Sequence, residues 1–182
     1  MPYIILAVVV VLAIWAVTVY NNFIRLKNHV EEAFSTMDVY LKKRYDLIPN
    51  LVETVKGYSK HESETLEKVI AARNSAMNAS SAAERIKGEG ELQGALKSLF
   101  ALAEAYPDLK ANTNFLDLQN SLKAIENDIA NSRKYYNGVV KSYNIKTEQF
   151  PSSIVAAIFK FERKPLFEVA DAAERENVRV KF

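Results

Sequence analysis

The chain has 182 residues, with five glycines, five prolines and no cysteine, and its 24 Lys and Arg against 22 Asp and Glu give a net charge of +2. The lack of cysteine excludes disulfides, thiolate zinc sites, iron–sulfur clusters and thiol catalysis. The scarcity of glycine and proline favours an all-helical domain, and the intermixed charges argue against nucleic-acid binding.

The first predicted element is an apolar run over residues 2–24 that contains no Lys, Arg, Asp, Glu or His. As a helix it would be roughly 30–35 Å long, which is enough to cross the hydrocarbon layer of a bilayer. The run has no basic residue before it and no A-x-A cleavage site to close it. We therefore expect a retained transmembrane anchor and not a cleaved signal peptide.

The cations that flank this run lie on its C-terminal side only, beginning with Arg25 and Lys27. Positively charged flanks of a membrane span stay preferentially in the cytoplasm. The sequence therefore predicts a single-pass protein with its N-terminus outside and the following domain in the cytoplasm.

From Phe23 onward the apolar residues follow a heptad pattern, which is typical of a buried helical face. No glycine or proline separates this pattern from the anchor, so we predict one helix that continues from the anchor into the domain. Arg44 interrupts the pattern and Pro49 lies within it, but the apolar positions stay in phase across the proline. This predicts a kink and not a break, with the helix ending near residues 57–60. The heptad positions are Phe23, Val30, Phe34, Met37, Leu41, Ile48, Leu51 and Val55.

Further helices follow along the chain, separated by segments rich in polar and small residues. Residues 79–90, which contain Lys87-Gly88-Glu89-Gly90, predict an exposed loop. Pro107 is expected to stop the helix before it, and Asn114 is expected to cap the next one. Residues 161–182 alternate charged and isolated apolar residues, which predicts a loosely held tail. The predicted helices span residues 63–78, 91–106, 114–148 and 152–159. In the first of these, Leu66, Val69, Ile70 and Met77 are predicted to point inward.

The longest of these helices carries the most regular heptad repeat of the chain. Pairing it with the first helix would bury both apolar faces, and the shorter helices would complete the bundle. The predicted fold is all-α: an N-terminal transmembrane helix that continues into an elongated antiparallel bundle of about four long helices plus a short C-terminal helix. We divide the chain into an anchor (1–24), a helical bundle (25–160) and a tail (161–182). The repeat positions are Phe115, Leu122, Ile129, Tyr136 and Tyr143.

Residues that could carry chemistry are few. His29 and His61 lie on different parts of the chain without a metal-ligand spacing around them, and both are expected at the surface. The five glycines form no nucleotide-binding loop, and no serine stands in a nucleophile-elbow setting. We therefore predict no catalytic residue, no cofactor, no metal and no enzymatic activity.

Polar residues cluster around Pro49, namely Arg44, Tyr45, Asp46 and Asn50. One explanation is that the kink frees carbonyl groups, which these side chains satisfy, or that they pair with a neighbouring helix. The other is that an arginine in a buried heptad position fixes helix register or oligomeric state. Both explanations make the cluster a candidate interaction site.

Two further groups of candidate interaction residues lie nearer the C-terminus. Tyr136 and Tyr143 suit either core packing or an interface, because each combines an apolar ring with a hydroxyl. The short run 152–161 is too apolar for one buried face and too short to span a bilayer. We predict that it lies against the membrane, in a neighbouring subunit or in the core. Its apolar candidates are Ile154, Ile158, Phe159 and Phe161.

The chain resembles the LemA family. The resemblance rests first on residues 42–58, with the sequence KKRYDLIPNLVETVKGY, and second on residues 102–112, LAEAYPDLKAN. Tyr135-Tyr136-Asn137, Tyr143-Asn144 and Phe150-Pro151 add to it. The family implies a single-pass protein of the bacterial inner membrane with a helical domain, and it carries no established catalytic residues.

The expected function is that of a non-enzymatic, membrane-anchored scaffold or interaction protein. The expected partners are the lipid bilayer, further copies of the chain and another membrane protein, but not nucleic acid. An alternative is an accessory subunit of a membrane enzyme, since the resemblance implies products encoded beside a membrane metalloprotease. An enzyme of an unfamiliar type is the third hypothesis.

Overall fold

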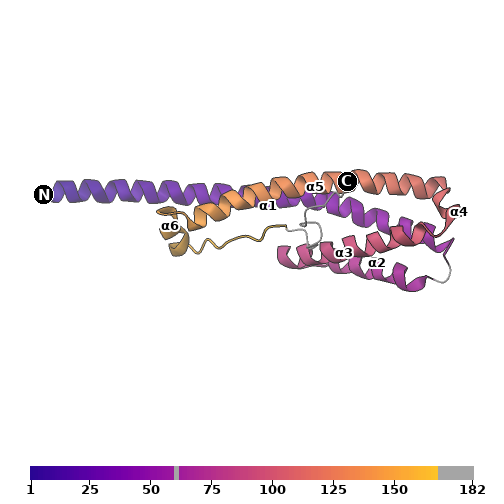
Figure 1. Ribbon diagram of the computed structural model, residues 1–182. Helices are drawn as coiled ribbons and strands as arrows, with labels where there is room; N and C mark the ends of the chain where they lie inside the picture. Colours follow the sequence, from indigo (N-terminus) through magenta and orange to yellow (C-terminus); the bar gives the residue numbers. More distant parts are fainter. Residues whose placement is uncertain (60–61, 168–182) are drawn as a thin grey trace, which may run out of the picture. The chain divides into compact units, whose positions relative to one another are not determined.

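The structure, a computed structural model, describes residues 1–59 and 62–167. No strand occurs in these residues, and the all-α bundle predicted from the sequence is confirmed (Figure 1). The helices of the described residues are α1 (Pro2–Lys56), α2 (Ser63–Met77), α3 (Ala82–Ala103), α4 (Pro107–Lys110), α5 (Thr113–Glu148) and α6 (Ser152–Ile158).

These helices contribute to two compact units. The first unit contains Met1–Met37 and Ser132–Leu166. The second contains Asp38–Asn131 and, of the remaining described residues, Phe167. Both α1 and α5 therefore take part in both units. The boundaries of anchor, bundle and tail at residues 24 and 160 stay predictions.

Helix α1 is continuous over 55 residues and passes through Pro49 without a break, as predicted. Its N-terminal part contains an 18-residue window with a mean hydropathy of 2.6, of which only 6% is buried. By length and composition, α1 therefore carries one candidate membrane span. Its last residue, Lys56, lies next to the predicted end.

In the first unit, α5 runs antiparallel to α1 (Figure 1). The ring of Phe23 lies 6.2 Å from that of Tyr143, and the ring of Phe34 lies 5.8 Å from that of Tyr136. The later residue of α1 therefore contacts the earlier residue of α5, as expected for antiparallel helices. Three of these four rings are buried, so the heptad pattern identified the packed faces correctly.

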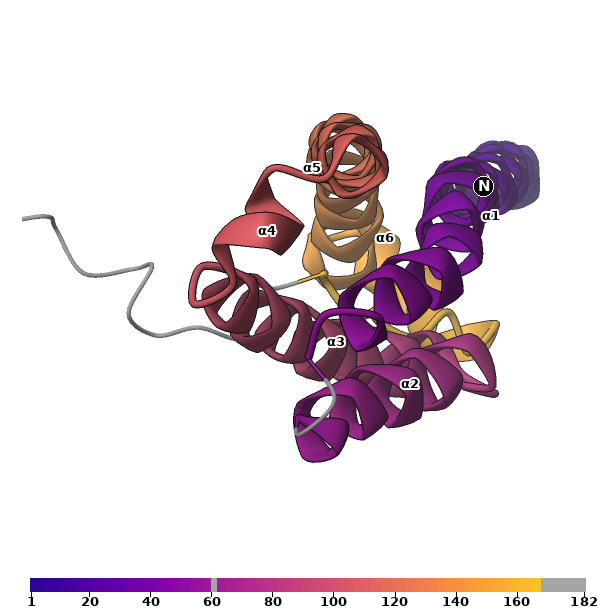
Figure 2. The same ribbon diagram turned by 90° about the vertical axis from the view of Figure 1, so that its right-hand side faces the viewer.

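In the second unit, α2 and α3 lie side by side, and Figure 2 shows them almost end-on. The loop predicted for residues 79–90 is wrong, because α3 already begins at Ala82 and includes Gly88 and Glu89. A Cβ atom on Gly88 would lie only 2.8 Å from the Cα atom of Ala76 on α2. The glycine is therefore present so that two helix backbones can approach closely, and not because the chain turns there.

The start of α3 is set by Ser81, whose side chain accepts a hydrogen bond from the amide of Glu84. In return, the Glu84 carboxylate accepts from the amide and hydroxyl of Ser80 at 3.0 and 2.7 Å. The Ser-x-x-Glu spacing is that of a capping box, and it satisfies amides that the first helical turn leaves without partners. A carboxylate held in this way has its pKa lowered, first of all by the Ser80 hydroxyl.

Two other predicted helix ends and one buried position are corrected by the structure. The cap of α5 is Asn112 and not Asn114, since the Asn112 side chain accepts from the amide of Phe115 at 3.0 Å. Pro107 does not end a helix; it starts the one-turn helix α4, because its missing amide needs no partner at a first helical position. On α2, Ala76 is buried and Met77 is 41% exposed, although Met77 was predicted to point inward.

The segment after α6, which begins the tail predicted from the sequence, makes side-chain hydrogen bonds with α5 at Lys164 and Pro165. The Asn144 side chain donates to the carbonyl of Lys164 and accepts from its amide, both at 2.9 Å. The Tyr136 hydroxyl donates to the carbonyl of Pro165 at 3.0 Å. These bonds satisfy an extended backbone that has no strand partner. Residues 168–182 of the predicted tail lie outside the described residues.

Candidate functional site

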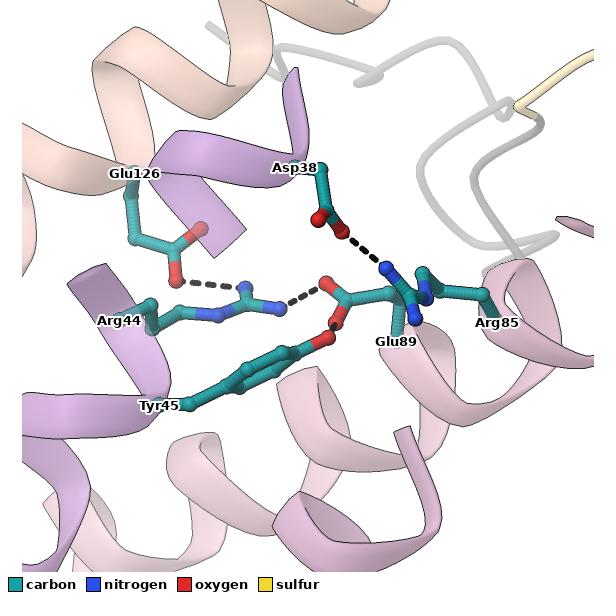
Figure 3. Close-up of polar contacts among 6 residues, drawn as sticks. All are labelled: Asp38, Arg44, Tyr45, Arg85, Glu89 and Glu126. Carbon is teal, nitrogen blue, oxygen red and sulfur yellow. Dashed lines mark hydrogen bonds and ion pairs between the residues drawn. The ribbon is translucent and has the colours of Figure 1, made fainter. Parts of the chain in front are cut away.

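Charged and polar side chains are buried together in the second unit, where α1, α3 and α5 meet (Figure 3). Arg44 on α1 forms an ion pair with Glu89 on α3, and its Nη1 donates to Oε1 of Glu126 on α5 at 2.8 Å. The hydroxyl of Tyr45 donates to the other carboxylate oxygen of Glu89. We call Arg44, Tyr45, Glu89 and Glu126 the buried ionic cluster; the side chain of Glu126, at its edge, is 37% exposed.

The centre of this cluster is fully withdrawn from solvent, since Arg44 and Glu89 are both 0% exposed. Burial by itself lowers the pKa of Arg44, but the carboxylates of Glu89 and Glu126 outweigh it, so that the pKa of Arg44 is raised. The guanidinium therefore stays charged at every ordinary pH. Its Nε has no hydrogen-bond partner in the described part of the chain. Removing one partner would leave an uncompensated charge in the core and would destabilise the fold.

Tyr45 stays protonated in this environment. Burial raises the pKa of its hydroxyl well above 10, and the neighbouring Glu89 carboxylate raises it further. The hydroxyl thus remains a donor to Glu89 across the physiological range. A second link between the same two helices is the ion pair of Arg85 on α3 with Asp38 on α1, which is more exposed to solvent.

The proline in α1 leaves a carbonyl without its helical donor, and another helix supplies one. Pro49 has no amide hydrogen, so the carbonyl of Tyr45 loses its partner four residues ahead. Arg73 on α2 donates to this carbonyl through Nε at 2.7 Å. The side chains nearest the proline in sequence do not take this role: Asp46 and Asn50 are exposed.

A groove of about 550 Å³ lies beside Pro49, on the side where α1 faces α2. Its floor is apolar, with Val52, Leu66 and Ile70, and charged residues lie at its margins. The volume falls in the range of small-molecule sites, but its lining holds no cluster of groups suited to catalysis. The lining residues are Pro49, Val52, Glu53, Lys56, Ser59, Ser63, Leu66, Glu67, Ile70, Ala71 and Asn74.

The candidates nearer the C-terminus divide into buried and exposed residues of the first unit. Tyr136 and Tyr143 are buried in the contact between α1 and α5. Burial raises the pKa of both hydroxyls. In contrast, Ile154, Ile158 and Phe159 are 49%, 68% and 52% exposed. Phe161 is intermediate in exposure. Its ring stacks on that of Phe23, with 4.6 Å between the ring centroids.

None of the partners that Arg44 and Tyr45 have in the structure was identified from the sequence. Glu89 was assigned to a loop because two glycines flank it, although Ser81 and Glu84 carry a helix-start pattern just before it. Glu126 looks like one of many surface acids on a helix, and Arg73 like one of many surface bases. No local sequence pattern identifies either residue as a partner of α1, because each contact joins helices that are far apart in the sequence.

The arrangement joins three helices through charged contacts. Within residues 1–59 and 62–167, no three His, Asp or Glu side chains gather in a way that could hold a metal ion. His29 is half-exposed and lies 3.5 Å from Glu32, while His61 is outside the described residues. The buried ionic cluster links three helices through directional contacts. It can therefore fix their register, as one of the two explanations for Arg44 proposes.

Comparison with known proteins identifies the family. Residues 33–182 match the sequence profile of the LemA family, which is most of the chain. The chain belongs to the LemA family. The family match includes α2 to α6 and the part of α1 that holds Arg44 and Tyr45. Together with the apolar start of α1, membership indicates a membrane-associated protein.

Relatives within this comparison carry two different names. Protein LemA of Metamycoplasma hominis is 29% identical over 166 residues, covering 88% of this chain and 72% of the relative. Magnetosome protein MamQ 2 of Paramagnetospirillum magneticum is 25% identical over 181 residues. Magnetosome protein MamQ of Magnetospirillum gryphiswaldense is 23% identical. Both alignments cover 85% of this chain. They cover only 66% of the length of the magnetosome proteins.

Proposed function

We propose that this chain is a non-enzymatic, membrane-anchored helical scaffold that self-associates at the bacterial inner membrane. The observation that carries the proposal is the continuity of α1, which joins a candidate span to a packed domain in a single helix. Few of the side chains in that span are covered, so the span is available to lipid. The domain would then be displayed at the membrane by a helix that has no flexible linker.

The packing of the domain supports a structural role more than a chemical one. The buried ionic cluster joins helices α1, α3 and α5 through the fully buried Arg44, which pairs with Glu89 and Glu126. Charged groups used in this way specify one arrangement of helices, and such specificity suits a protein whose surface has to be presented reproducibly. The names of the relatives are not enzyme names, which agrees with this role.

Anchoring is tested first, with two matched substitutions. Val10 in the candidate span and Val39 in the domain are similarly exposed, at 49% and 54%. An aspartate at the centre of a span costs about 2.5–3.5 kcal/mol of insertion free energy, whereas one on a solvated helix face costs little. Val10→Asp should therefore lower the fraction of the protein recovered with membranes, and Val39→Asp should not. Equal recovery of both variants would contradict the anchor.

Self-association is tested on the full chain in a mild detergent. Light scattering that subtracts the detergent contribution gives the mass of the protein particle. One homogeneous oligomer supports the scaffold. A monomer recovered with a stoichiometric second protein supports the alternative, an accessory subunit of a membrane enzyme such as a membrane metalloprotease. Catalytic turnover by the purified chain alone would contradict both.

A further inference from the structure

The short helix α6 lies beside the point where α1 changes from apolar to charged (Figure 1). The ring of Phe159, at the end of α6, lies 4.7 Å from the ring of Tyr20. Phe161 lies 5.7 Å from Tyr20 and stacks on Phe23 at 4.6 Å. Tyr20 and Phe23 belong to the last turns of the apolar run, and Arg25 follows directly. If α1 crosses a bilayer, α6 lies at the surface of that bilayer.

Helix α6 buries one face in the first unit and leaves an apolar face open. Val155 and Ala156 are 2% and 3% exposed. Ile154 and Ile158 are separated by four residues, so they share a face, and both are largely exposed. Phe159 and, before the helix, Phe150 are exposed as well, at 52% and 78%. Large apolar side chains gathered in this way mark a surface that another apolar phase covers.

The residue two positions beyond the end of α6 provides a second, independent observation. Lys160 has a φ of 56°, in the left-handed region. The amide of Phe161 donates to the carbonyl of Ala156 at 2.9 Å, which is the bond of a helix end that turns through a left-handed residue. Glycine or asparagine normally occupies this position, because other side chains are strained there. A lysine is therefore not explained by the turn itself.

The charge of that lysine suits an anionic lipid surface. Lys160 is exposed beside Phe159, and Lys164 follows it closely, while Arg163 forms an ion pair with Glu148 at 2.7 Å. On α1, Arg25 and Lys27 lie just beyond the apolar run, so cations of both segments occupy the region after the span. A cation beside exposed isoleucine and phenylalanine is the pattern of a segment that lies in the headgroup layer.

We propose that α6 and the residues around it, from Phe150 to Phe161, form an interfacial membrane-docking segment. Ile154, Ile158 and Phe159 insert into the headgroup layer of the bilayer that α1 crosses, and Lys160 contacts anionic headgroups. The segment gives the first unit a second attachment beside the span and so restricts rotation of α1 about its axis. This inference rests on the proposed anchoring of α1.

The test uses the full chain in vesicles of phosphatidylcholine with or without phosphatidylglycerol. Because the sequence has no cysteine, single cysteines can carry a spin label whose collisions with oxygen and with a water-soluble nickel complex report depth. Labels are placed at Ile158, at Val10 in the span and at Val39 on the domain, with Ile154 as a second position in α6. We expect oxygen-rich, nickel-poor collisions at Val10, Ile154 and Ile158, and nickel-rich collisions at Val39.

The outcomes separate the two proposals. A label at Ile158 that meets nickel as freely as Val39 does, with Val10 deep in lipid, overturns the docking segment but leaves the anchor intact. Low collision rates with both reagents at Ile158 overturn it in favour of contact with a second copy of the chain. Nickel-rich collisions at Val10 overturn the anchor and the docking segment together.

The role of Lys160 is tested by Lys160→Asn and Lys160→Arg, each combined with the label at Ile158. Asparagine tolerates the left-handed backbone, so Lys160→Asn should keep or raise the melting temperature. It should nonetheless weaken the lipid contact of the label about fivefold in anionic vesicles, which is the effect of one cation near such a surface. Lys160→Arg should restore the contact. An unchanged contact in Lys160→Asn would overturn the assignment of Lys160 to headgroups.

Discussion

The guanidinium of Arg44 donates to the carboxylate of Glu89, and neither side chain reaches solvent. The two residues are 45 positions apart and come from helices α1 and α3. We expect a pair buried to this degree to hold its helices in one register, because a shift along either axis would leave a charge without its partner.

The first prediction concerns this pair. Arg44→Ala leaves Glu89 buried without its cation, which should reduce the free energy of unfolding by about 3–5 kcal/mol. Lys42→Ala, two positions earlier on the same helix, removes a cation that is exposed and should change stability little. Urea unfolding in detergent, followed by helical circular dichroism, compares the two variants. Similar losses in both would mean that the buried pair does not hold the bundle together.

The second prediction concerns pH. Because the pKa of Tyr45 is raised in the folded chain, first by burial and then by Glu89, the folded state keeps a proton that the unfolded state loses above pH 10. Stability from Tyr45 is thus fully present below pH 10 and falls above it, by up to about 1.4 kcal/mol per pH unit. Tyr45→Phe should flatten this alkaline slope, whereas Tyr135→Phe, at an exposed position, should not.

Some of the slope should remain in Tyr45→Phe, because burial also raises the pKa values of Tyr136 and Tyr143. Tyr45→Phe should also cost about 1–3 kcal/mol at neutral pH, since one oxygen of Glu89 loses its donor in the core. Unfolding measured from pH 8 to 11 gives both quantities. An alkaline slope that matches the parent chain would rule out the protonated Tyr45 as its source.

The third prediction compares two glycines of α3. A methyl group at Gly88 would collide with the backbone of Ala76, so Gly88→Ala should lower stability by about 1–3 kcal/mol despite the better helix propensity of alanine. Apart from its chain neighbours and the adjacent backbone of its own helix, an added Cβ at Gly94 would have no atom within 4 Å. Gly94→Ala should therefore stabilise the chain by up to about 1 kcal/mol. Melting temperatures that move in the same direction for both would contradict the close approach of α2 and α3.

The fourth prediction concerns the segment after α6. Asn144 is 5% exposed and both donates to and accepts from the backbone of Lys164. Asn144→Ala should release this segment and lower the local stability by about 1–3 kcal/mol. Hydrogen exchange should accelerate at residues 160–166 while the buried ionic cluster keeps its protection. Asn120→Ala, at an exposed position of α5, serves as the control and should leave exchange unchanged.

The fifth prediction concerns orientation, which follows from Arg25 and Lys27 on the C-terminal side of the apolar run. A cysteine in place of the exposed Ala83 should be protected from a membrane-impermeant thiol reagent in intact cells and should react after lysis. A cysteine in place of Pro2, at the start of the chain, should react with the reagent already in intact cells. Labelling of Ala83→Cys in intact cells would place the domain outside the cytoplasm.

The sequence by itself determined the all-α class, the candidate span and the packed faces of the two long helices. These features depend on local periodicity: Phe23, Met37, Leu41 and Ile129 fall on heptad positions, and all four are buried. The continuity of α1 through Pro49 was also predictable, because the apolar residues on either side of the proline stay in phase.

Only the tertiary structure decided what the polar residues do. Arg44 was visible as a charge in an apolar pattern, but its partners Glu89 and Glu126 are 45 and 82 residues away, and no local rule pairs them. Gly88 looked like a loop residue. A glycine that permits a turn and a glycine that permits close helix packing cannot be told apart from the residue type alone. The distinction lies in the backbone of Ala76 on another helix, and it exists only after the two helices have packed.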